Sequence, residues 1–270
     1  MAAPIHKGTA LITGASSGIG AVYADRLAQS GYDLILVARR ADKLRSLAVE
    51  ITNRTQRSVE TIAADLTKPD ELAMVEAVLQ SDASLTLLVN NAGVGATAPL
   101  LQSDISAMDH MITLNVSVVT RLAYAVAPAL VARGDGTIIN IASIVALAPE
   151  LLNGVYGGTK AFVLAFSQSL QHELADKGVR VQAVLPGATA TDFWDAAGLP
   201  MQHLPQEIVM STQDMVDAAL AGLALGEVVT IPALPDIADW NTFENARKAM
   251  APRLSRAVPA ARYAASANSQ

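Results

Sequence analysis

Thr13-Gly14-Ala15-Ser16-Ser17-Gly18-Ile19-Gly20 decides the fold, because it joins an apolar run at 9–13 to a helical pattern over 18–30. Glycines in a strand-to-helix turn let the backbone bend sharply and approach an anion without a Cβ clash, and the helix N-terminus adds free N–H groups. We therefore predict a cradle for a dinucleotide pyrophosphate; the alternative is a turn that only connects strand to helix. The spacing Gly-x-x-x-Gly-x-Gly differs from the general Gly-x-Gly-x-x-Gly fingerprint, and no Gly-Lys-Ser/Thr follows, as a P-loop requires.

Short apolar runs alternate with helical patterns along most of the chain. Several of the runs are apolar throughout, which is typical of a parallel sheet covered on both faces. The alternation predicts an α/β fold with a single Rossmann-like domain, a doubly wound parallel sheet of about seven strands with helices on both faces. We expect this domain over 1–257, with a substrate loop at 187–210 and a flexible tail at 258–270. The predicted strands are 9–13, 33–39, 59–63, 86–90, 137–141, 179–185 and 228–231, and the predicted helices are 18–30, 41–54, 69–81, 104–133, 154–176 and 211–224.

Composition favours a globular protein and disfavours several kinds of partner. Of the 270 residues, 51% are hydrophobic and 16% charged, and the net charge of −6 argues against nucleic acid as a partner. Cysteine is absent and the four histidines lack metal-binding spacing, so no metal site is predicted. No N-terminal run resembles a signal peptide, and the most apolar later run, 124–132, is too short to span a bilayer. We expect no membrane partner and a cytoplasmic location.

The end of the second predicted strand indicates which dinucleotide is bound. NAD-binding proteins place Asp or Glu there to accept a hydrogen bond from the ribose 2′-hydroxyl. This strand ends in Val37-Ala38-Arg39-Arg40 instead, and a guanidinium matches a 2′-phosphate well. The cofactor predicted is NADP(H), with Arg39 as the favoured contact and Ser16 as an added hydroxyl donor. The alternative is that both arginines only cap the strand at the surface.

Tyr156 and Lys160 lie four residues apart in a helical segment, so both project from one face. A free tyrosine has a pKa near ~10, and an adjacent ammonium or an oxidised nicotinamide ring favours the phenolate. The pair therefore predicts a general acid/base site, although Tyr-x-x-x-Lys alone also occurs by chance.

Other polar or glycine residues gather at the predicted strand ends. They are Asn90-Asn91-Ala92-Gly93, Ser143 and Pro186-Gly187, and Asn115 lies in the long helical segment. Ligands of open α/β sheets bind at that edge, so these residues support a site around Tyr156.

These motifs, in this order, resemble the short-chain dehydrogenase/reductase family. The match runs from about 7 to 191 and includes Asp65 after the third strand. The resemblance implies that Tyr156 exchanges a proton with the substrate oxygen and that Ser143 polarises that oxygen. It also implies that Lys160 holds the nicotinamide ribose and lowers the tyrosine pKa, and that Asn115 anchors a water in a proton relay.

The resemblance also implies the contacts to the cofactor. The region of Asp65 and Leu66 would flank the adenine, and the residues after the sixth strand would meet the nicotinamide carboxamide and the phosphates. The full predicted set is Gly14, Ser16, Ser17, Gly18, Ile19, Gly20, Arg39, Arg40, Asp65, Leu66, Asn91, Ala92, Gly93, Asn115, Tyr156, Lys160, Pro186, Gly187, Thr189 and Thr191. The chain departs from many family members in carrying Gly157-Gly158 beside the catalytic tyrosine.

The predicted substrate side is apolar. Arginine and lysine are absent from 187–210, so a carboxylate or phosphate substrate has no clamp there. We expect an apolar ketone, aldehyde or secondary alcohol; the alternative is that these side chains only pack the loop onto the sheet. The residues predicted to contact substrate are Val94, Ile144, Leu151, Phe193 and Trp194.

The sequence thus predicts an NADP(H)-dependent oxidoreductase that acts on a small carbonyl or alcohol. Two alternatives stand beside it: a dinucleotide-binding regulatory module without turnover, and a nucleotide-sugar epimerase or dehydratase, whose relatives carry a larger C-terminal domain. The helical segments 104–133 and 154–176 have apolar residues on more than one side. Relatives of the family often pair through these helices, so a homodimer or homotetramer is expected.

Overall fold

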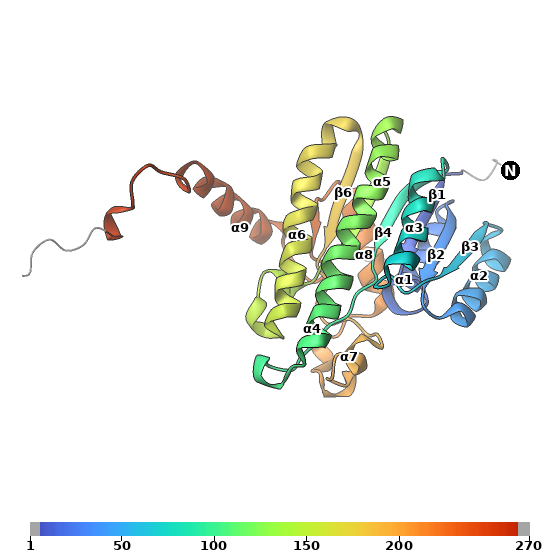
Figure 1. Ribbon diagram of the computed structural model, residues 1–270, viewed down its shortest axis with the longest axis horizontal. Coiled ribbons are helices and arrows are strands. Elements are labelled where there is room, and N and C mark those ends of the chain that lie inside the picture. The colour runs from blue at the N-terminus through green and yellow to red at the C-terminus, as the bar shows by residue number, and fades with distance from the viewer. Residues whose placement is uncertain (1–5, 264–270) are drawn as a thin grey trace, which may run out of the picture. The chain divides into compact units, whose positions relative to one another are not determined.

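Residues 6–263 are described by the computed structural model, and within them seven strands form one parallel sheet (Figure 1). The strand order is β3-β2-β1-β4-β5-β6-β7, and every neighbouring pair is parallel. The chain therefore reverses its direction of winding between β1 and β4, which is where ligands of such sheets bind. The strands are β1 Thr9–Thr13, β2 Asp33–Ala38, β3 Val59–Ala63, β4 Leu85–Asn90, β5 Gly136–Ile141, β6 Val179–Val184 and β7 Val229–Thr230.

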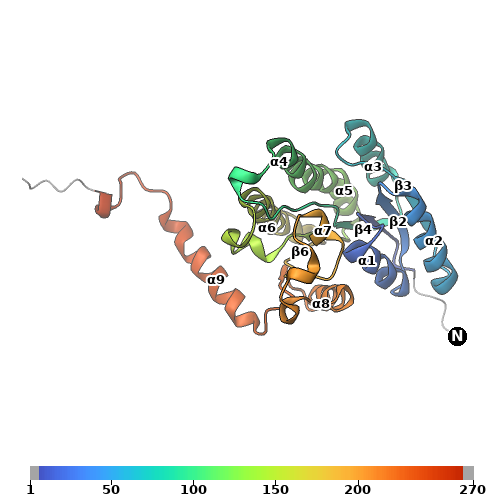
Figure 2. The same cartoon turned by 90° about the horizontal axis from the view of Figure 1, so that it is seen from below.

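Helices cover both faces of this sheet, which confirms the predicted fold class. Figure 2 shows α5 and α6 on one side of the strands and α1 and α8 on the other. The helices are α1 Gly18–Gln29, α2 Ala41–Thr55, α3 Pro69–Ser81, α4 Ile105–Ile112, α5 Val119–Arg133, α6 Gly154–Leu174, α7 Phe193–Ala196, α8 Thr212–Ala224 and α9 Ile237–Met250.

Each face of the sheet has its own buried core. On one face Val75 of α3, Leu122 of α5 and Leu170 of α6 pack against the strands. On the other face Tyr23 of α1 and Met215 of α8 do the same. Alternate side chains of each strand point to opposite faces, so a strand that is buried on both faces is mostly apolar. This explains why several of the strands were predictable from apolar runs.

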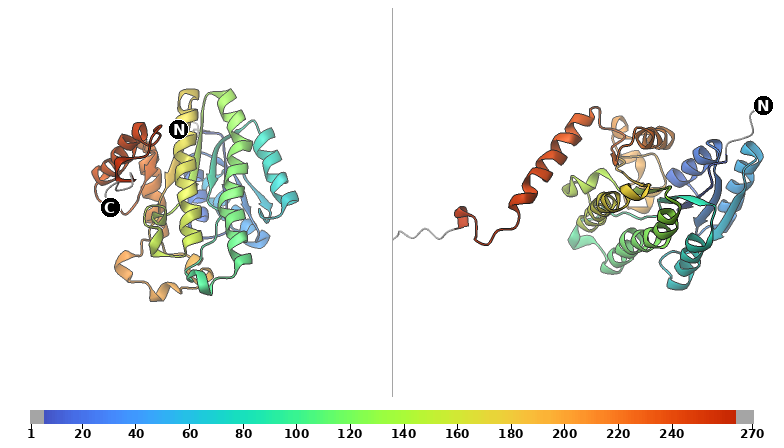
Figure 3. Two further views of the ribbon diagram at one scale, coloured as in Figure 1. Left: turned by 60° about the vertical axis from the view of Figure 1, so that its left-hand side comes forward. Right: turned by 90° about the horizontal axis from the view of Figure 1, so that it is seen from above.

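The helix that follows β4 is long and contains an irregular turn. The run Ile105–Arg133 has the length and the mean hydropathy, 1.5, that a membrane-spanning helix would need. Leu122, Val126 and Leu130 of this run are fully buried in the core of the domain, as is usual for a core helix. A π-helical turn at Thr113–Val118 separates α4 from α5. Figure 3 shows α5 lying beside α6 over one face of the sheet.

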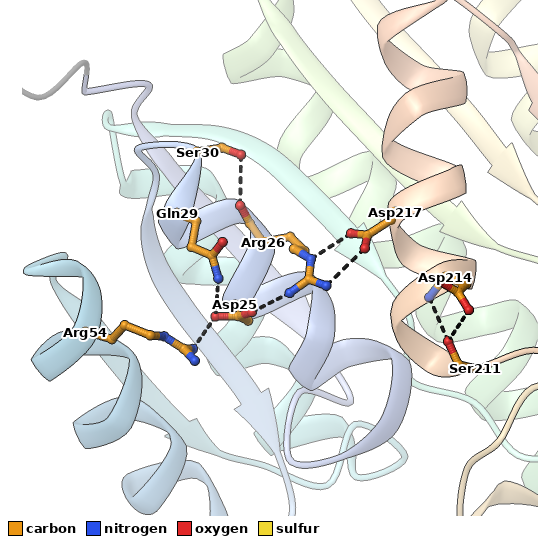
Figure 4. Close-up of polar contacts among 8 residues, drawn as sticks. All are labelled: Asp25, Arg26, Gln29, Ser30, Arg54, Ser211, Asp214 and Asp217. Carbon is orange, nitrogen blue, oxygen red and sulfur yellow. Dashed lines mark hydrogen bonds and ion pairs between the residues drawn. The ribbon is translucent and has the colours of Figure 1, made fainter.

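Helix α1 is tied to its neighbours by a polar cluster (Figure 4). The Arg26 guanidinium donates to both carboxylate oxygens of Asp217 on α8, at 2.6 and 3.0 Å, and to Asp25 at 2.7 Å. Arg54 of α2 also contacts the Asp25 carboxylate. These bonds link three helices on one face of the sheet, although the partial exposure of the ion pairs limits what each contributes to stability.

Contacts divide the chain into two compact units, one ending at Ala233 and one beginning at Leu234. The second unit contains α9, which the sequence patterns did not predict. Within α9 the rings of Trp240 and Phe243 lie 5.5 Å apart, and Arg247 pairs with Glu244. The predicted domain limit at 257 and the flexible tail at 258–270 stay predictions, and 264–270 lie outside the described residues.

Candidate active site

A cleft of about 590 Å³ opens at the carboxyl ends of the strands. Its lining comes from the residues that follow β1, β2, β4, β5 and β6, together with α6 and the loop after β6. The cleft brings together most of the predicted site: Gly14, Ser17, Gly18, Ile19, Arg39, Arg40, Asn91, Ala92, Gly93, Ser143, Tyr156, Lys160, Pro186, Gly187, Thr189 and Thr191.

The glycine turn after β1 has the geometry of an anion cradle. Gly14 and Gly18 adopt φ of +66° and +55°, a region that side-chain-bearing residues rarely enter. A Cβ on Gly14 would lie 2.9 Å from the Cα of Ala92, and one on Gly20 only 2.5 Å from the Gly14 carbonyl oxygen. Ser17 makes no side-chain cap, so the first N–H groups of α1 stay available to a ligand. Gly20 does not line the cleft; it lets α1 pack closely on the turn.

The two arginines after β2 both line the cleft, and Arg40 makes the better-defined contacts. Its guanidinium donates to the hydroxyls of Ser17 at 2.8 Å and Ser16 at 3.2 Å. This arrangement places the positively charged Arg40 guanidinium beside the uncapped N-terminus of α1. The sequence pattern favoured Arg39, whereas the structure places Arg40 against the glycine turn.

The segment after β4 is held in place by the hydroxyl of Thr13, a residue that the sequence analysis did not single out for this role. The Thr13 hydroxyl accepts from the N–H groups of Asn91 and Ala92, both at 3.0 Å, and donates to the Val89 carbonyl at 3.3 Å. The Asn91 amide donates to the carbonyls of Thr13 and Gly14 at 2.9 and 3.2 Å. These bonds fix the floor of the cleft to the glycine turn.

Two predicted adenine contacts do not line the cleft. The Asp65 carboxylate accepts from the Thr67 N–H at 3.1 Å and from its hydroxyl at 2.7 Å. The Leu66 side chain is 4% exposed and packs in the hydrophobic core. Only the main chain of Leu66 is therefore available for a ligand contact.

Tyr156 and Lys160 project from the first turns of α6 and are both buried. The Lys160 ammonium lies 5.9 Å from the centre of the Tyr156 ring and donates to the Ile141 carbonyl at 2.9 Å. Burial raises the pKa of Tyr156 to about 12, and its hydrogen bond with Ser143 acts in the opposite direction. Burial lowers the pKa of Lys160 to about 8. The Tyr156 phenol is therefore protonated at neutral pH, whereas the Lys160 ammonium has a pKa about one unit above neutral pH.

The start of α6 is fixed by an N-cap that sequence reasoning missed. The side-chain oxygen of Asn153 accepts hydrogen bonds from the N–H groups of Val155 and Tyr156, at 2.9 and 3.3 Å. Its amide nitrogen donates to the Ala98 carbonyl at 2.6 Å. Asparagine is among the preferred N-cap residues because its side-chain oxygen satisfies free helix donors. The cap therefore fixes the position of Tyr156 in the first turn of α6.

Asn115 lies in the π-helical turn and is 1% exposed. Its amide donates to the Val94 carbonyl at 2.8 Å and to the Thr159 hydroxyl at 3.1 Å, and its oxygen accepts from the Val94 N–H at 3.0 Å. Thr159 in turn donates to the Tyr156 carbonyl at 2.8 Å. Asn115 thus connects the segment after β4 to α6 behind the cleft. π-turns occur frequently at functional sites, and this one turns Asn115 inward.

A buried chain of amides joins the sheet to α6. Asn90 donates to Asn140 at 2.9 Å, Asn140 donates to Ser167 at 2.9 Å, and Ser167 donates to the Val163 carbonyl at 2.7 Å. The Asn90 side-chain oxygen has no hydrogen-bond partner. Because polar groups in a core are stabilising only when paired, this chain fixes the register of α6 on β4 and β5.

All five predicted substrate residues, Val94, Ile144, Leu151, Phe193 and Trp194, line the same cleft as Tyr156. The Trp194 indole donates to the Thr189 carbonyl at 2.9 Å, which anchors α7. Beside these five, the lining includes Gly95, Ile141, Ala142, Val145, Leu152, Ala188, Asp192, Ala196, Leu199, Leu204 and Ile208.

The two glycines beside Tyr156 differ in their surroundings. A Cβ on Gly157 would meet Pro149 at 3.1 Å, so a small residue is favoured there. A Cβ on Gly158 would meet nothing within 4 Å.

Among the described residues, no group of three or more His, Cys, Asp or Glu is placed to hold a metal ion.

Known proteins are similar to this chain in sequence and in fold. Residues 8–200 match the family model described as short chain dehydrogenase. The chain therefore belongs to the short-chain dehydrogenase/reductase family and is an oxidoreductase of that type.

Three relatives illustrate the similarity. An uncharacterized oxidoreductase of Staphylococcus epidermidis is 32% identical over 214 residues, covering 77% of this chain and 91% of the relative. A short-chain dehydrogenase from Sphingobium yanoikuyae, solved in complex with NADPH, is 46% identical with a TM-score of 0.92, covering 95% of this chain and 99% of the other. The bulky-bulky ketone specific alcohol dehydrogenase from Comamonas testosteroni is 43% identical with a TM-score of 0.88, covering 96% and 100%.

Proposed function

We propose that this protein is an NADP(H)-dependent oxidoreductase that interconverts an apolar ketone or aldehyde and its alcohol, with Tyr156 as general acid/base. The observation that carries the proposal is the burial of Tyr156 and Lys160 on one face of α6 within the cleft that also contains the glycine turn. A dinucleotide seated on that turn would bring its reactive ring toward the phenol.

The residues of the cleft fit NADP(H). The Cβ-free surface of Gly14 and Gly18, followed by the uncapped N-terminus of α1, suits a pyrophosphate. Arg40, which donates a hydrogen bond to Ser17, suits a 2′-phosphate, and Arg39 lines the same cleft. The NADPH complex of the Sphingobium relative supports this assignment. When bound, the nicotinamide supplies or accepts the hydride.

The protein's own part in reduction is to bind the carbonyl oxygen and to donate a proton. The Ser143 hydroxyl hydrogen-bonds the oxygen, and the Tyr156 phenol donates the proton that turns it into a hydroxyl. The pKa of about 12 keeps that proton on the phenol until charge develops on the substrate oxygen. In oxidation the proton moves in the reverse direction, from alcohol to phenolate.

Lys160 and Asn115 support proton transfer by the Tyr156 phenol. The Lys160 ammonium, held by the Ile141 carbonyl, favours the phenolate that proton transfer leaves. We assign Asn115 to the proton relay that restores the phenol, and through Thr159 it also fixes the helix that carries Tyr156.

Apolar side chains on the substrate side favour a ketone or aldehyde with apolar substituents. Ile144, Leu151 and Phe193 line the cleft together with Tyr156. The Comamonas relative, which is specific for bulky-bulky ketones, supports a substrate of this kind. A cytoplasmic location and a homodimer or homotetramer complete the proposal.

A panel of carbonyl compounds tests it, with NADPH consumption followed by absorbance. We expect turnover of apolar ketones and aldehydes. Preference for small charged oxo acids would overturn the substrate assignment, and absence of NADPH consumption with every carbonyl would overturn the activity.

A further inference from the structure

The Phe193 ring is confined on three sides beside the catalytic phenol. Its centre lies 5.8 Å from that of Tyr156, at an interplanar angle of 43°. It meets the Trp194 ring edge-on at 5.5 Å. On the third side stands Gly95, where an added Cβ would lie 2.2 Å from the Phe193 Cζ. The ring therefore occupies the space that any side chain at 95 would need.

Gly95 is a glycine for reasons of space rather than backbone conformation. It is not among the glycines with positive φ, so its backbone accommodates other residues. The nearest atoms to its missing Cβ, at 2.2, 2.8 and 3.2 Å, all belong to Phe193. The identity of residue 95 is thus coupled to the position of one ring.

The segments that carry these two residues are bound to each other. The Thr97 N–H and hydroxyl both donate to the Ala197 carbonyl, at 3.2 and 2.9 Å, and Ala197 directly follows α7. The foot of the same loop is closed by pairing between Thr189 and Met210. Because α7 is anchored at both ends, the backbone that carries Phe193 is held at the cleft.

We propose that Phe193, seated in the space left by Gly95, sets the size of the substituent that a carbonyl substrate can place beside Tyr156. This inference rests on the proposed ketone-reducing function and names the residue that determines specificity within it. A substrate whose carbonyl oxygen reaches the phenol would place one substituent near this ring, because both rings line the same cleft with their centres 5.8 Å apart.

Opposite changes at the two positions should have opposite effects. Phe193→Ala removes the ring and opens the space beside the phenol. Gly95→Ala adds a methyl group that displaces the ring, and since the anchored Trp194 blocks one side, the ring moves toward the substrate space. In the double variant the new methyl group finds no ring to displace, so the effect of Gly95→Ala should disappear.

The test compares kcat/KM for benzophenone, with two large substituents, and acetophenone, with one small substituent, at saturating NADPH. Phe193→Ala should raise the benzophenone-to-acetophenone ratio by about tenfold or more, and Phe193→Leu should give an intermediate ratio. Gly95→Ala should lower kcat/KM for both ketones by about tenfold, and adding Phe193→Ala to it should restore the ratio of Phe193→Ala alone.

Phe162→Ala is the matched control, because Phe162 lies on α6 but does not line the cleft, and its ratio should equal that of the wild type. An unchanged ratio in both Phe193 variants, or a Gly95→Ala defect that persists in the double variant, would refute the inference while wild-type turnover stands. A wild-type protein that reduces neither these ketones nor any other carbonyl would refute the proposed function itself.

Discussion

Removal of the Arg40 guanidinium should weaken NADPH binding selectively. Arg40 is held by two hydrogen bonds, at 2.8 Å to Ser17 and 3.2 Å to Ser16, so it is positioned before a ligand arrives. A hydrogen bond to a charged partner contributes about 1.5–3 kcal/mol. If Arg40 makes one such bond to the 2′-phosphate, Arg40→Ala should raise the Kd for NADPH by about 10- to 150-fold. NADH lacks that phosphate, so its Kd should stay unchanged.

Titration of nicotinamide fluorescence with NADPH and NADH, at low and high salt, measures both constants. The effect of Arg40→Ala should shrink as salt rises, because screening weakens the lost attraction. Arg39→Ala, measured in parallel, shows how the two guanidinium groups share the phosphate, and Arg39→Asp should shift preference further toward NADH. Arg45→Ala removes the same charge from α2 outside the cleft and serves as the control. An NADPH-to-NADH ratio of Kd values that stays at the wild-type level in both Arg39 and Arg40 variants would refute the reasoning.

The buried amide chain and the catalytic lysine give further predictions. Asn140→Leu leaves the Asn90 amide without its acceptor, which should cost about 1–3 kcal/mol and lower the Tm by about 2–12 °C in a thermal melt; an unchanged Tm would show that the chain does not stabilise the fold. Because burial lowers the pKa of Lys160 to about 8, its ammonium is lost as pH rises through that value, and kcat/KM for carbonyl reduction should fall by about tenfold per pH unit above it. Lys160→Arg keeps its charge, so the residual activity of that variant should lack the inflection, and an inflection common to both proteins would assign it to another group.

The strands were predictable because their physical signal is local. A strand buried on both faces is mostly apolar at successive positions, and the predicted limits of the fully buried strand β1 agree with the structure residue for residue. The limits of β3 also agree, although this strand contains Glu60 and has no buried residue. Helix α9 was missed because its apolar residues are interrupted by charged ones, as in Glu244 to Lys248. Within residues 6–263 no strand follows α9 to complete a βαβ pattern. The π-turn around Asn115 was also invisible, since Thr113–Val118 continues an ordinary helical pattern.

The lining of the candidate cleft was predictable where several residues form one motif and not where a single side chain acts alone. The glycine turn and the Tyr156–Lys160 pair carry recognisable spacing. Thr13 and Asn153 do not, because a lone hydroxyl or amide acquires its role only from neighbours distant in sequence. The choice between Arg39 and Arg40 depends on how the chain leaves β2, which composition does not encode.

Tyr156→Phe tests the central claim most directly, because it removes only the hydroxyl that exchanges the proton. The variant should bind NADPH with wild-type affinity in a fluorescence titration and reduce a good ketone substrate more slowly by a factor on the order of 10²–10⁴. Retention of wild-type turnover in a variant that still binds NADPH would contradict the assignment of Tyr156 as general acid/base.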